Sequence, residues 1–396
     1  MRILVVCQHY YPEPFRLPDI CETLVQHGHT VTVVTGTPNY PEGKIYKGYE
    51  NRKKADEVIG GVRVHRCPLI PRKTGVLFRI LNYYSFVLSS EWYLRRCKED
   101  FDVVFVNQLS PVMMAQAGLS WAKRNGKKCV LYCLDLWPES LLVGGIHKNS
   151  AVYKLFLNIS RRLYRKADTI VVSSKAFIDY FETTLKITGR DIRWMPQYAE
   201  DIFGVISAEE KQKPVVDFLL AGNIGQLQSV ETIVEAARLL KGENNIHIHI
   251  VGNGVSLENC KTMAEGLENI TFHGRHDVSE MPAFYAMADV MMVSLVKDEG
   301  LSANLPGKVQ SYLAAGKPVV GPINGETPRI IAEANCGMCS PAEDPEALAQ
   351  VMRQIAADPE RLKIYGENAR QYYQNHFSKE IFTTTLTEIL RENCVD

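Results

Sequence analysis

Short apolar runs alternate with helix-forming segments along the chain, and this alternation restricts the possible folds more than any other feature. In the first half, residues 3–7 have the composition of a buried strand, residues 17–27 that of a helix closed by Gly28, and residues 30–35 that of a second strand. Further strands are predicted at residues 103–107, 129–133 and 169–173. This order of elements is typical of parallel sheets covered by helices.

The same alternation begins again after residue 214. Strands are predicted at residues 217–220, 246–251, 270–273, 290–295 and 319–321, with helices at residues 229–240 and 308–315. Residues 196–214, between the two series, are polar and charged, as in a linker. The sequence therefore predicts an α/β protein of two doubly wound domains, and such domains bind ligands at the carboxyl ends of their strands.

The charges are balanced overall but separated along the chain. The 396 residues include 45 Lys+Arg and 45 Asp+Glu, yet residues 1–200 carry a net charge of +11 and residues 201–396 one of −11. A basic domain indicates an anionic partner, and nucleic acid and anionic lipid both fit this pattern. No secretory signal or run of about 20 apolar residues is found. The ten scattered cysteines favour reduced thiols in the cytoplasm.

Residues 74–98 form an unusual predicted helix. Apolar and aromatic side chains cover most of its surface, and Arg79, Asn82, Ser85 and Ser89 form a narrower polar stripe. Lys and Arg residues stand at both ends of this segment. The pattern is typical of a helix that lies in the interface of an anionic membrane. A core or inter-domain helix is the alternative, and the sequence leaves both open.

Two glycine turns in the second half follow predicted strands. They are Gly222-x-x-Gly225 and Gly252-x-Gly254. Glycine lets backbone N–H groups approach a phosphate closely, and a following helix N-terminus favours negative charge. Lys308 begins a predicted helix and Arg275 directly follows a strand, so both place cations at turns of this kind. We therefore expect a diphosphate site in the second half.

Two common nucleotide-binding classes lack their signatures. The first turn, residues 8–16, has no glycine, and Thr35-Gly36-Thr37 stands where a dinucleotide-binding dehydrogenase has its acidic ribose ligand. The chain has no G-x-x-x-x-G-K-[ST] segment. The sequence thus argues against a dehydrogenase and against a P-loop nucleotidase.

A specific resemblance is carried by ordered motifs in both halves. The second half contains Gly222-Asn223-Ile224-Gly225, Gly252-Asn253-Gly254, Phe272-His273-Gly274-Arg275, Pro306-Gly307-Lys308 and Ala315-Gly316-Lys317-Pro318. The first half contains Gln8-His9-Tyr10-Tyr11-Pro12-Glu13, Thr37-Pro38-Asn39-Tyr40-Pro41 and Asp135-Leu136-Trp137-Pro138-Glu139. Together they resemble family 4 glycosyltransferases over nearly the whole chain, and in particular the bacterial L-fucosamine (N-acetyl) transferase branch of O-antigen and capsule synthesis.

The resemblance implies a GT-B fold of two Rossmann-like domains that face a central cleft. Residues 1–198 would bind the acceptor, residues 199–377 the nucleotide sugar, and residues 378–396 would form a helix that crosses back to the first domain. Enzymes of this kind retain the anomeric configuration and use neither a metal nor another cofactor. The residues assigned to the nucleotide sugar are Gly222, Asn223, Gly225, Gln228, Gly252, Gly254, Gly274, Arg275, Glu299, Asn304, Lys308 and Ser311.

The chain departs from the family pattern at several of these positions. Ala303 and Ser311 occupy the places of the two glutamates that the family commonly has, so the usual ribose carboxylate is missing. Glu299 is either a substitute sugar contact or a solvated loop charge. Gln228 stands near the place of the family's first diphosphate lysine, which leaves more of that role to Lys308. Arg16 is expected to supply positive charge from the acceptor side.

Acid–base candidates come mainly from the first half. Asp135 follows a buried strand and is either a catalytic carboxylate or an N-cap, a position that aspartate favours. Glu139 is the second carboxylate, and Lys308 joins the catalytic set because it would stabilise the leaving diphosphate. His9, at the end of the first strand, is either an acceptor-side contact or a structural residue.

The combined prediction is a retaining glycosyltransferase of surface polysaccharide synthesis. It would move an N-acetylated amino sugar from UDP to a saccharide on undecaprenyl diphosphate, at the anionic inner face of the cell membrane, and would not bind nucleic acid. Two alternatives stay open. One is a UDP-sugar 2-epimerase of the same architecture, and the other is a non-catalytic partner that only binds the nucleotide sugar.

Overall fold

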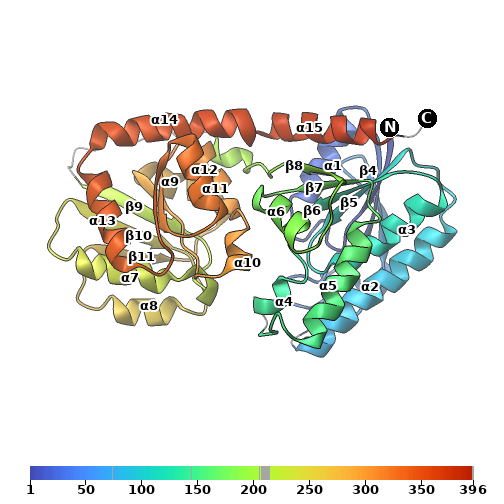
Figure 1. Ribbon diagram of the computed structural model, residues 1–396, viewed down its shortest axis with the longest axis horizontal. Helices are drawn as coiled ribbons and strands as arrows, with labels where there is room; N and C mark the ends of the chain where they lie inside the picture. The colour runs from blue at the N-terminus through green and yellow to red at the C-terminus, as the bar shows by residue number, and fades with distance from the viewer. Residues whose placement is uncertain (74, 144, 205, 207–214, 395–396) are drawn as a thin grey trace. The chain divides into compact units, whose positions relative to one another are not determined.

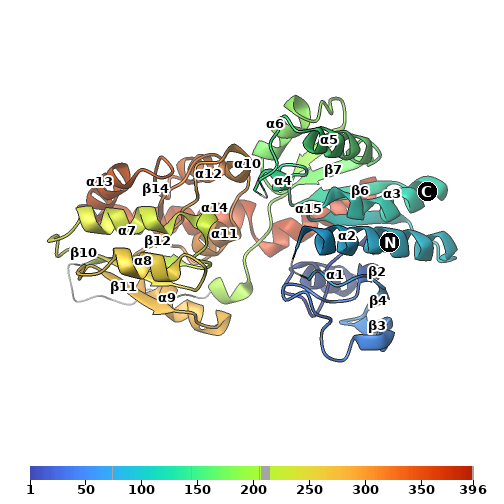
Figure 2. The ribbon, with the colours of Figure 1, turned by 90° about the horizontal axis from the view of Figure 1, so that it is seen from below.

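The computed structural model describes residues 1–73, 75–143, 145–204, 206 and 215–394. The chain divides into two compact units, one of Met1–Met195 with Thr383–Asp396 and the other of Pro196–Phe382. In each unit, helices flank a sheet (Figures 1 and 2). Most of the predicted linker, residue 205 and residues 207–214, lies outside the described residues.

The first unit contains an eight-stranded sheet in the order β3-β4-β2-β1-β5-β6-β7-β8. The strands are β1 (Arg2–Val6), β2 (Thr30–Gly36), β3 (Asp56–Ile59), β4 (Val62–Cys67), β5 (Val103–Gln108), β6 (Cys129–Cys133), β7 (Thr169–Val172) and β8 (Asp191–Trp194). Among the strands of the described residues, only β3 and β4 pair antiparallel. The helices are α1 (Leu17–Gln26), α2 (Val76–Arg96), α3 (Gln116–Arg124), α4 (Ser140–Val143), α5 (Ala151–Tyr164) and α6 (Ala176–Thr183).

The centre of this sheet is apolar on both faces. Every residue of β5 and β6 is buried, and the side chains of β1 from Ile3 to Val6 are completely inaccessible. Parallel strands that are covered by helices on both sides require such continuous apolar runs. The polar residues that follow β1 and β6 therefore stand at one edge of the sheet, where the strands end.

The second unit contains a six-stranded parallel sheet in the order β11-β10-β9-β12-β13-β14. Its strands are β9 (Val216–Ala221), β10 (Ile246–Val251), β11 (Ile270–Gly274), β12 (Val290–Met292), β13 (Val319–Pro322) and β14 (Gly337–Ser340). The helices are α7 (Val230–Leu239), α8 (Leu257–Met263), α9 (Met281–Met287), α10 (Glu299–Ser302), α11 (Gly307–Ala314), α12 (Glu326–Ala334), α13 (Pro345–Ala356) and α14 (Pro359–His376), and α15 (Lys379–Glu392) follows. Phe218 and Ile248 of the sheet belong to one core with Ile233 of α7 and Met352 of α13.

Some bounds differ from the sequence-based expectation. The strand expected at residues 290–295 ends at Met292, although the Val293 N–H still donates to Val320 O at 3.0 Å. Beyond this point Ser294 turns its hydroxyl to Gln228 O. The second unit begins at Pro196 rather than residue 199, since the Tyr198 ring packs on Phe382 at 5.1 Å and the Ala199 N–H donates to Tyr373 Oη.

Candidate functional site

The glycine turns of the second unit pack backbone against backbone. A Cβ atom on Gly252 would lie 1.8 Å from Gly222 O, and one on Gly254 would lie 2.1 Å from Ile224 O. The Gly222 N–H donates to Val251 O at 2.9 Å, and the Gly252 N–H donates to Gly274 O at 2.8 Å. These positions therefore require glycine because the three turns that follow β9, β10 and β11 touch one another.

A cavity of about 390 Å³ opens at these turns. Its lining includes Gly222, Asn223, Gly252, Arg275 and Tyr285. It stands at the carboxyl ends of β9, β10 and β11, where doubly wound sheets bind their ligands. Among the donor-site residues predicted from the sequence, the structure thus brings Gly222, Asn223, Gly252 and Arg275 to one cavity.

Lys308 lies beside this cavity in the first turn of α11. Its Nζ is 3.0 Å from the position that a Cβ atom of Gly222 would occupy. The ammonium group is buried and has no hydrogen-bond partner among the described residues. Burial lowers its pKa from the usual 10.5 to about 8. A buried cation without a counter-charge at a helix N-terminus is suited to hold an anion.

The other predicted donor-site residues do not line this cavity. Gln228 accepts a hydrogen bond from Asn223 Nδ2 at 3.0 Å, and both side chains lie across the Gly225 turn. Gly254 and Gly274 hold the turns in place through the contacts above. Glu299 is exposed in the first turn of α10, and Asn304 Nδ2 donates to Gly300 O at 3.3 Å. Ser311 is buried within α11.

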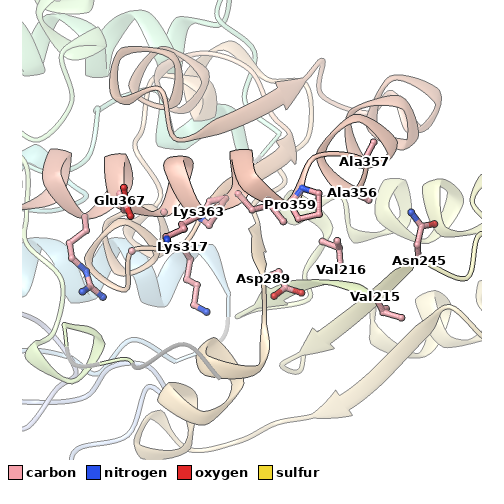
Figure 3. A pocket seen from close by; sticks show the side chains of 15 residues that line it. Val215, Val216, Asn245, Asp289, Lys317, Ala356, Ala357, Pro359, Lys363 and Glu367 are labelled. Atoms are coloured by element: carbon pink, nitrogen blue, oxygen red, sulfur yellow. The ribbon is translucent and has the colours of Figure 1, made fainter. Parts of the chain in front are cut away.

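A second and larger cavity, of about 820 Å³, lies elsewhere in this unit (Figure 3). Val216, Asp289 and Lys317 stand at or just before the amino ends of β9, β12 and β13 and line it together with residues of α14 such as Lys363. Lys317 Nζ donates to Ala288 O at 2.7 Å. Size therefore does not identify the donor site, because ligands of such sheets bind at the opposite ends of the strands.

The carboxylates of the first unit are both held by neighbours. Asp135 follows β6, and its Oδ2 accepts a hydrogen bond from the Ser110 N–H at 3.1 Å. Burial raises the pKa of Asp135. It does not cap a helix, since α4 begins only at Ser140. Glu139 is buried, and its Oε1 accepts a hydrogen bond from the Tyr153 hydroxyl of α5 at 2.5 Å.

The acceptor-side candidates bring in a residue that sequence reasoning did not single out. His9 Nδ1 lies 3.1 Å from Glu13 Oε2, and both side chains are buried. The spacing of four residues between a histidine and a glutamate was the available signal. Arg16 stands at the N-cap position of α1 with helical backbone angles. Among the described residues, no group of three or more His, Cys, Asp or Glu side chains is arranged to hold a metal ion.

Two family descriptions match the chain in this order. "Glycosyl transferase 4-like domain" matches residues 15–196, and "Glycosyl transferases group 1" matches residues 216–358. The chain belongs to the family 4 glycosyltransferases. The family expected from the sequence motifs is thereby confirmed, and the second match spans every residue that lines the 390 Å³ cavity.

A named relative agrees with this family. The glycosyltransferase is 28% identical over 410 residues to WcaI of Escherichia coli K12, a candidate colanic acid biosynthesis glycosyl transferase, and the alignment covers 96% of this chain and 97% of the relative. Glycosyl transfer in the synthesis of bacterial surface polysaccharides is therefore supported as the general function.

Solved structures show the fold. Sucrose-phosphate synthase from Thermosynechococcus elongatus superposes with a TM-score of 0.75 at 16% identity, covering 99% of this chain and 98% of that one. Anabaena Alr3699/HepE in complex with UDP and glucose superposes with a TM-score of 0.66 at 13% identity, covering 99% of both chains. The GT-B fold class predicted for this glycosyltransferase is confirmed.

Proposed function

We propose that this glycosyltransferase moves an N-acetylated amino sugar from UDP to a saccharide carried on undecaprenyl diphosphate, with retention of configuration. The observation that carries the proposal is the unpartnered Lys308 ammonium beside Gly222. Bond cleavage leaves negative charge on the UDP diphosphate, and a preorganised cation in a water-poor site stabilises that charge strongly. Lys308 and the α11 N-terminus supply this stabilisation from protein groups, so the proposed reaction needs no metal.

The choice of UDP rests on a protein of the same fold and on the cavity beside Lys308. HepE, which shares the fold, was solved with UDP and glucose. The 390 Å³ cavity is lined by the turns after β9 and β10 and by Tyr285 of α9, and we assign the nucleoside to it. The amino sugar and the lipid-linked acceptor are proposed from the motif resemblance.

We also propose that the enzyme binds the anionic inner face of the cell membrane through α2. Exposed apolar side chains gather on this helix, among them Leu77 at 65%, Leu88 at 69% and Trp92 at 59%. The Arg96 guanidinium lies over the Trp92 ring at 4.1 Å, and Lys73 lies over Phe78 at 5.6 Å. No helix in the described part of the chain is sufficiently long and apolar to span a bilayer.

Of the polar stripe of α2, only Asn82 is buried; Arg79 is exposed, and Ser85 and Ser89 are half-buried. Asn82, Phe86, Ser90 and Leu94 are the buried residues of the helix. Asn82 uses its whole amide there, accepting from Gln8 Nε2 at 2.7 Å and donating to Ile70 O at 2.7 Å. The apolar side of α2 is therefore left for another partner, as in helices that lie in a membrane interface.

A ligand screen tests the donor assignment. We would measure the thermal midpoint of the purified enzyme with UDP, GDP, CDP, dTDP and NAD, and then with UDP-amino sugars. Ligands that bind only the folded protein raise the midpoint. A shift with UDP and its amino sugars, and transfer to a lipid-linked saccharide, are the expected results. Conversion of the UDP-sugar without an acceptor would instead indicate an epimerase, and binding without turnover a non-catalytic partner.

A further inference from the structure

His9 and Glu13 form a buried pair just beyond the end of β1. The imidazole Nδ1 lies 3.1 Å from Glu13 Oε2, and the two side chains are 6% and 1% exposed. This is the sheet edge at which doubly wound domains bind ligands. Because Nδ1 faces Glu13, only the other imidazole nitrogen, Nε2, is left for a ligand.

The hydrogen bonds of Glu13 indicate which nitrogen of His9 carries the proton. The N–H groups of Asn39 and Tyr40 donate to Oε1 at 2.8 and 2.7 Å, and the Tyr10 N–H donates to Oε2 at 3.3 Å. Backbone N–H groups can only donate, so both oxygens act as acceptors, as they do in a carboxylate. His9 must therefore donate from Nδ1. In the neutral form of the ring, the second nitrogen, Nε2, then carries the lone pair.

Aromatic contacts fix the plane of the same ring. His9 stacks on Phe15 with ring centroids 5.0 Å apart and an interplanar angle of 18°. Tyr40 packs on His9 at 5.4 Å and on Phe15 at 5.4 Å. The imidazole is thus held by one hydrogen bond and two rings, while Nε2 makes no hydrogen bond to any described residue.

We propose that His9 Nε2 accepts a hydrogen bond from a sugar hydroxyl of the acceptor saccharide, and that Glu13 is a positioning residue that selects the neutral ring tautomer with its proton on Nδ1. The proposal rests on the proposed glycosyl transfer. The donor cavity belongs to the second unit, so we assign the ligand of His9, which is in the first unit, to the acceptor. A sugar hydroxyl is a suitable partner because it can donate a hydrogen bond to Nε2. An alkyl group or an ionised phosphate has no hydrogen to donate.

Three substitutions separate positioning from simple structural support. Glu13→Gln keeps an oxygen for the N–H groups of Asn39 and Tyr40 but places an amide N–H opposite His9 Nδ1. The ring must then accept at Nδ1 and carry its proton on Nε2, so it can no longer accept the sugar hydroxyl. His9→Asn retains a donor near Glu13 and lacks Nε2, whereas His9→Gln places an amide oxygen near the Nε2 position.

The first measurement is the ring tautomer, from ¹⁵N-histidine spectra of the full-length protein, with the His9 signal assigned by its loss in His9→Asn. We expect the neutral wild-type ring to be protonated on Nδ1 and the Glu13→Gln ring on Nε2. Octyl glycosides of N-acetylglucosamine and of galactose should shift the wild-type Nε2 signal. A wild-type ring protonated on Nε2, or an Nε2 signal that no glycoside moves, would overturn the proposal.

The second measurement is steady-state transfer to the same glycosides and to lipid-linked saccharides. Loss of one hydrogen bond and an unpaired group should raise the acceptor KM roughly 10- to 100-fold in Glu13→Gln and His9→Asn. His9→Gln should recover part of the loss, and the donor KM and the UDP-induced thermal shift should stay unchanged in all three.

Wild-type acceptor KM values in Glu13→Gln would refute the inference alone. A wild-type enzyme that binds UDP but transfers to no acceptor would refute the proposed function, and the ring spectra would still decide the inference.

Discussion

Lys308 Nζ lies 3.0 Å from the point where a Cβ atom of Gly222 would stand, and no described residue pairs with it. The contact explains why a glycine and a lysine that are far apart in the sequence belong to one site. A side chain at residue 222 would occupy the space beside the ammonium group. Without it, an anion can approach both the cation and the backbone of the turn.

The first prediction is that Lys308→Met stabilises the ligand-free protein and impairs transfer. Below pH 8 both the folded and unfolded states carry the Lys308 proton, so the full cost of burying the charge is present. A pKa lowered from 10.5 to about 8 corresponds to roughly 3 kcal/mol at neutral pH. Denaturant unfolding at pH 7 should show a higher free energy of unfolding in the variant. Transfer should fall at least about 100-fold.

The pH dependence supplies the internal check on this prediction. As pH rises from 8 to 10.5, the folded wild type loses the proton before the unfolded chain does, so its stability should rise towards that of the variant. Lys241→Met, at an exposed position of the same unit, should change neither stability nor activity appreciably. Equal stability of Lys308→Met and the wild type at pH 7 would contradict the burial of an unpaired charge.

A second prediction concerns UDP affinity and pH. The diphosphate favours the charged form of Lys308, so binding above pH 8 must be accompanied by uptake of one proton. Calorimetric titration should show the dissociation constant rising by up to about tenfold for each pH unit above 8. Lys308→Met should bind weakly with little dependence on pH over the same range. A wild-type affinity that stays constant up to pH 10 would place the diphosphate away from Lys308.

The third prediction separates the two kinds of glycine in the second unit. Gly254→Ala would set a Cβ atom 2.1 Å from Ile224 O, a buried backbone atom that also accepts the Ser256 N–H at 3.0 Å. The turns must move apart, so we expect the UDP-induced thermal shift to disappear and the midpoint to fall by several degrees.

Gly307→Ala is the matched control for that variant. Apart from its two chain neighbours and the backbone of α11, no atom of the described residues lies within 4 Å of its Cβ position, and the residue begins α11. Alanine favours the helix over glycine by up to about 1 kcal/mol, so the midpoint should hold or rise and UDP should still bind. Similar losses in both variants would show that the Ile224 contact is not what demands glycine.

How far the sequence predicts this fold depends on burial. The strands at residues 129–133 and 246–251 were predicted with the bounds that β6 and β10 have, because both are interior to their sheets and rich in apolar residues. β4 was not recognised although it is interior and mostly buried, because Arg63, His65 and Arg66 interrupt its apolar run. The edge strands β3, β8 and β14 were not recognised either. Most of their residues are exposed or only half-buried, so they carry no continuous apolar run.

Chain position alone predicted part of the candidate site. Glycines and cations directly after strands indicated the donor turns, since chain position alone places them at the sheet edge. Glu13 was not recognised because its partners Asn39 and Tyr40 come from a distant loop. Asn82 shows the limit of helix patterns: they locate a polar stripe, but only the packing shows that Asn82 is buried while Arg79 of the same stripe is exposed.

The last prediction contrasts the two sides of α2. Asn82→Ala removes a fully buried amide and leaves Gln8 Nε2 and Ile70 O without this partner. Each buried group left unpaired costs about 1–3 kcal/mol, so the free energy of unfolding should fall by a few kcal/mol. The triple variant Leu77→Ser, Leu88→Ser, Trp92→Ser changes only exposed side chains and should keep wild-type stability. Membrane binding is measured by flotation with anionic vesicles. The triple variant should stay unbound, while the folded fraction of Asn82→Ala should bind. Wild-type binding should weaken with added salt, because the cations at the ends of α2 contribute. Retained binding by the triple variant, or a collapse of its stability, would show that this face of α2 meets protein rather than lipid.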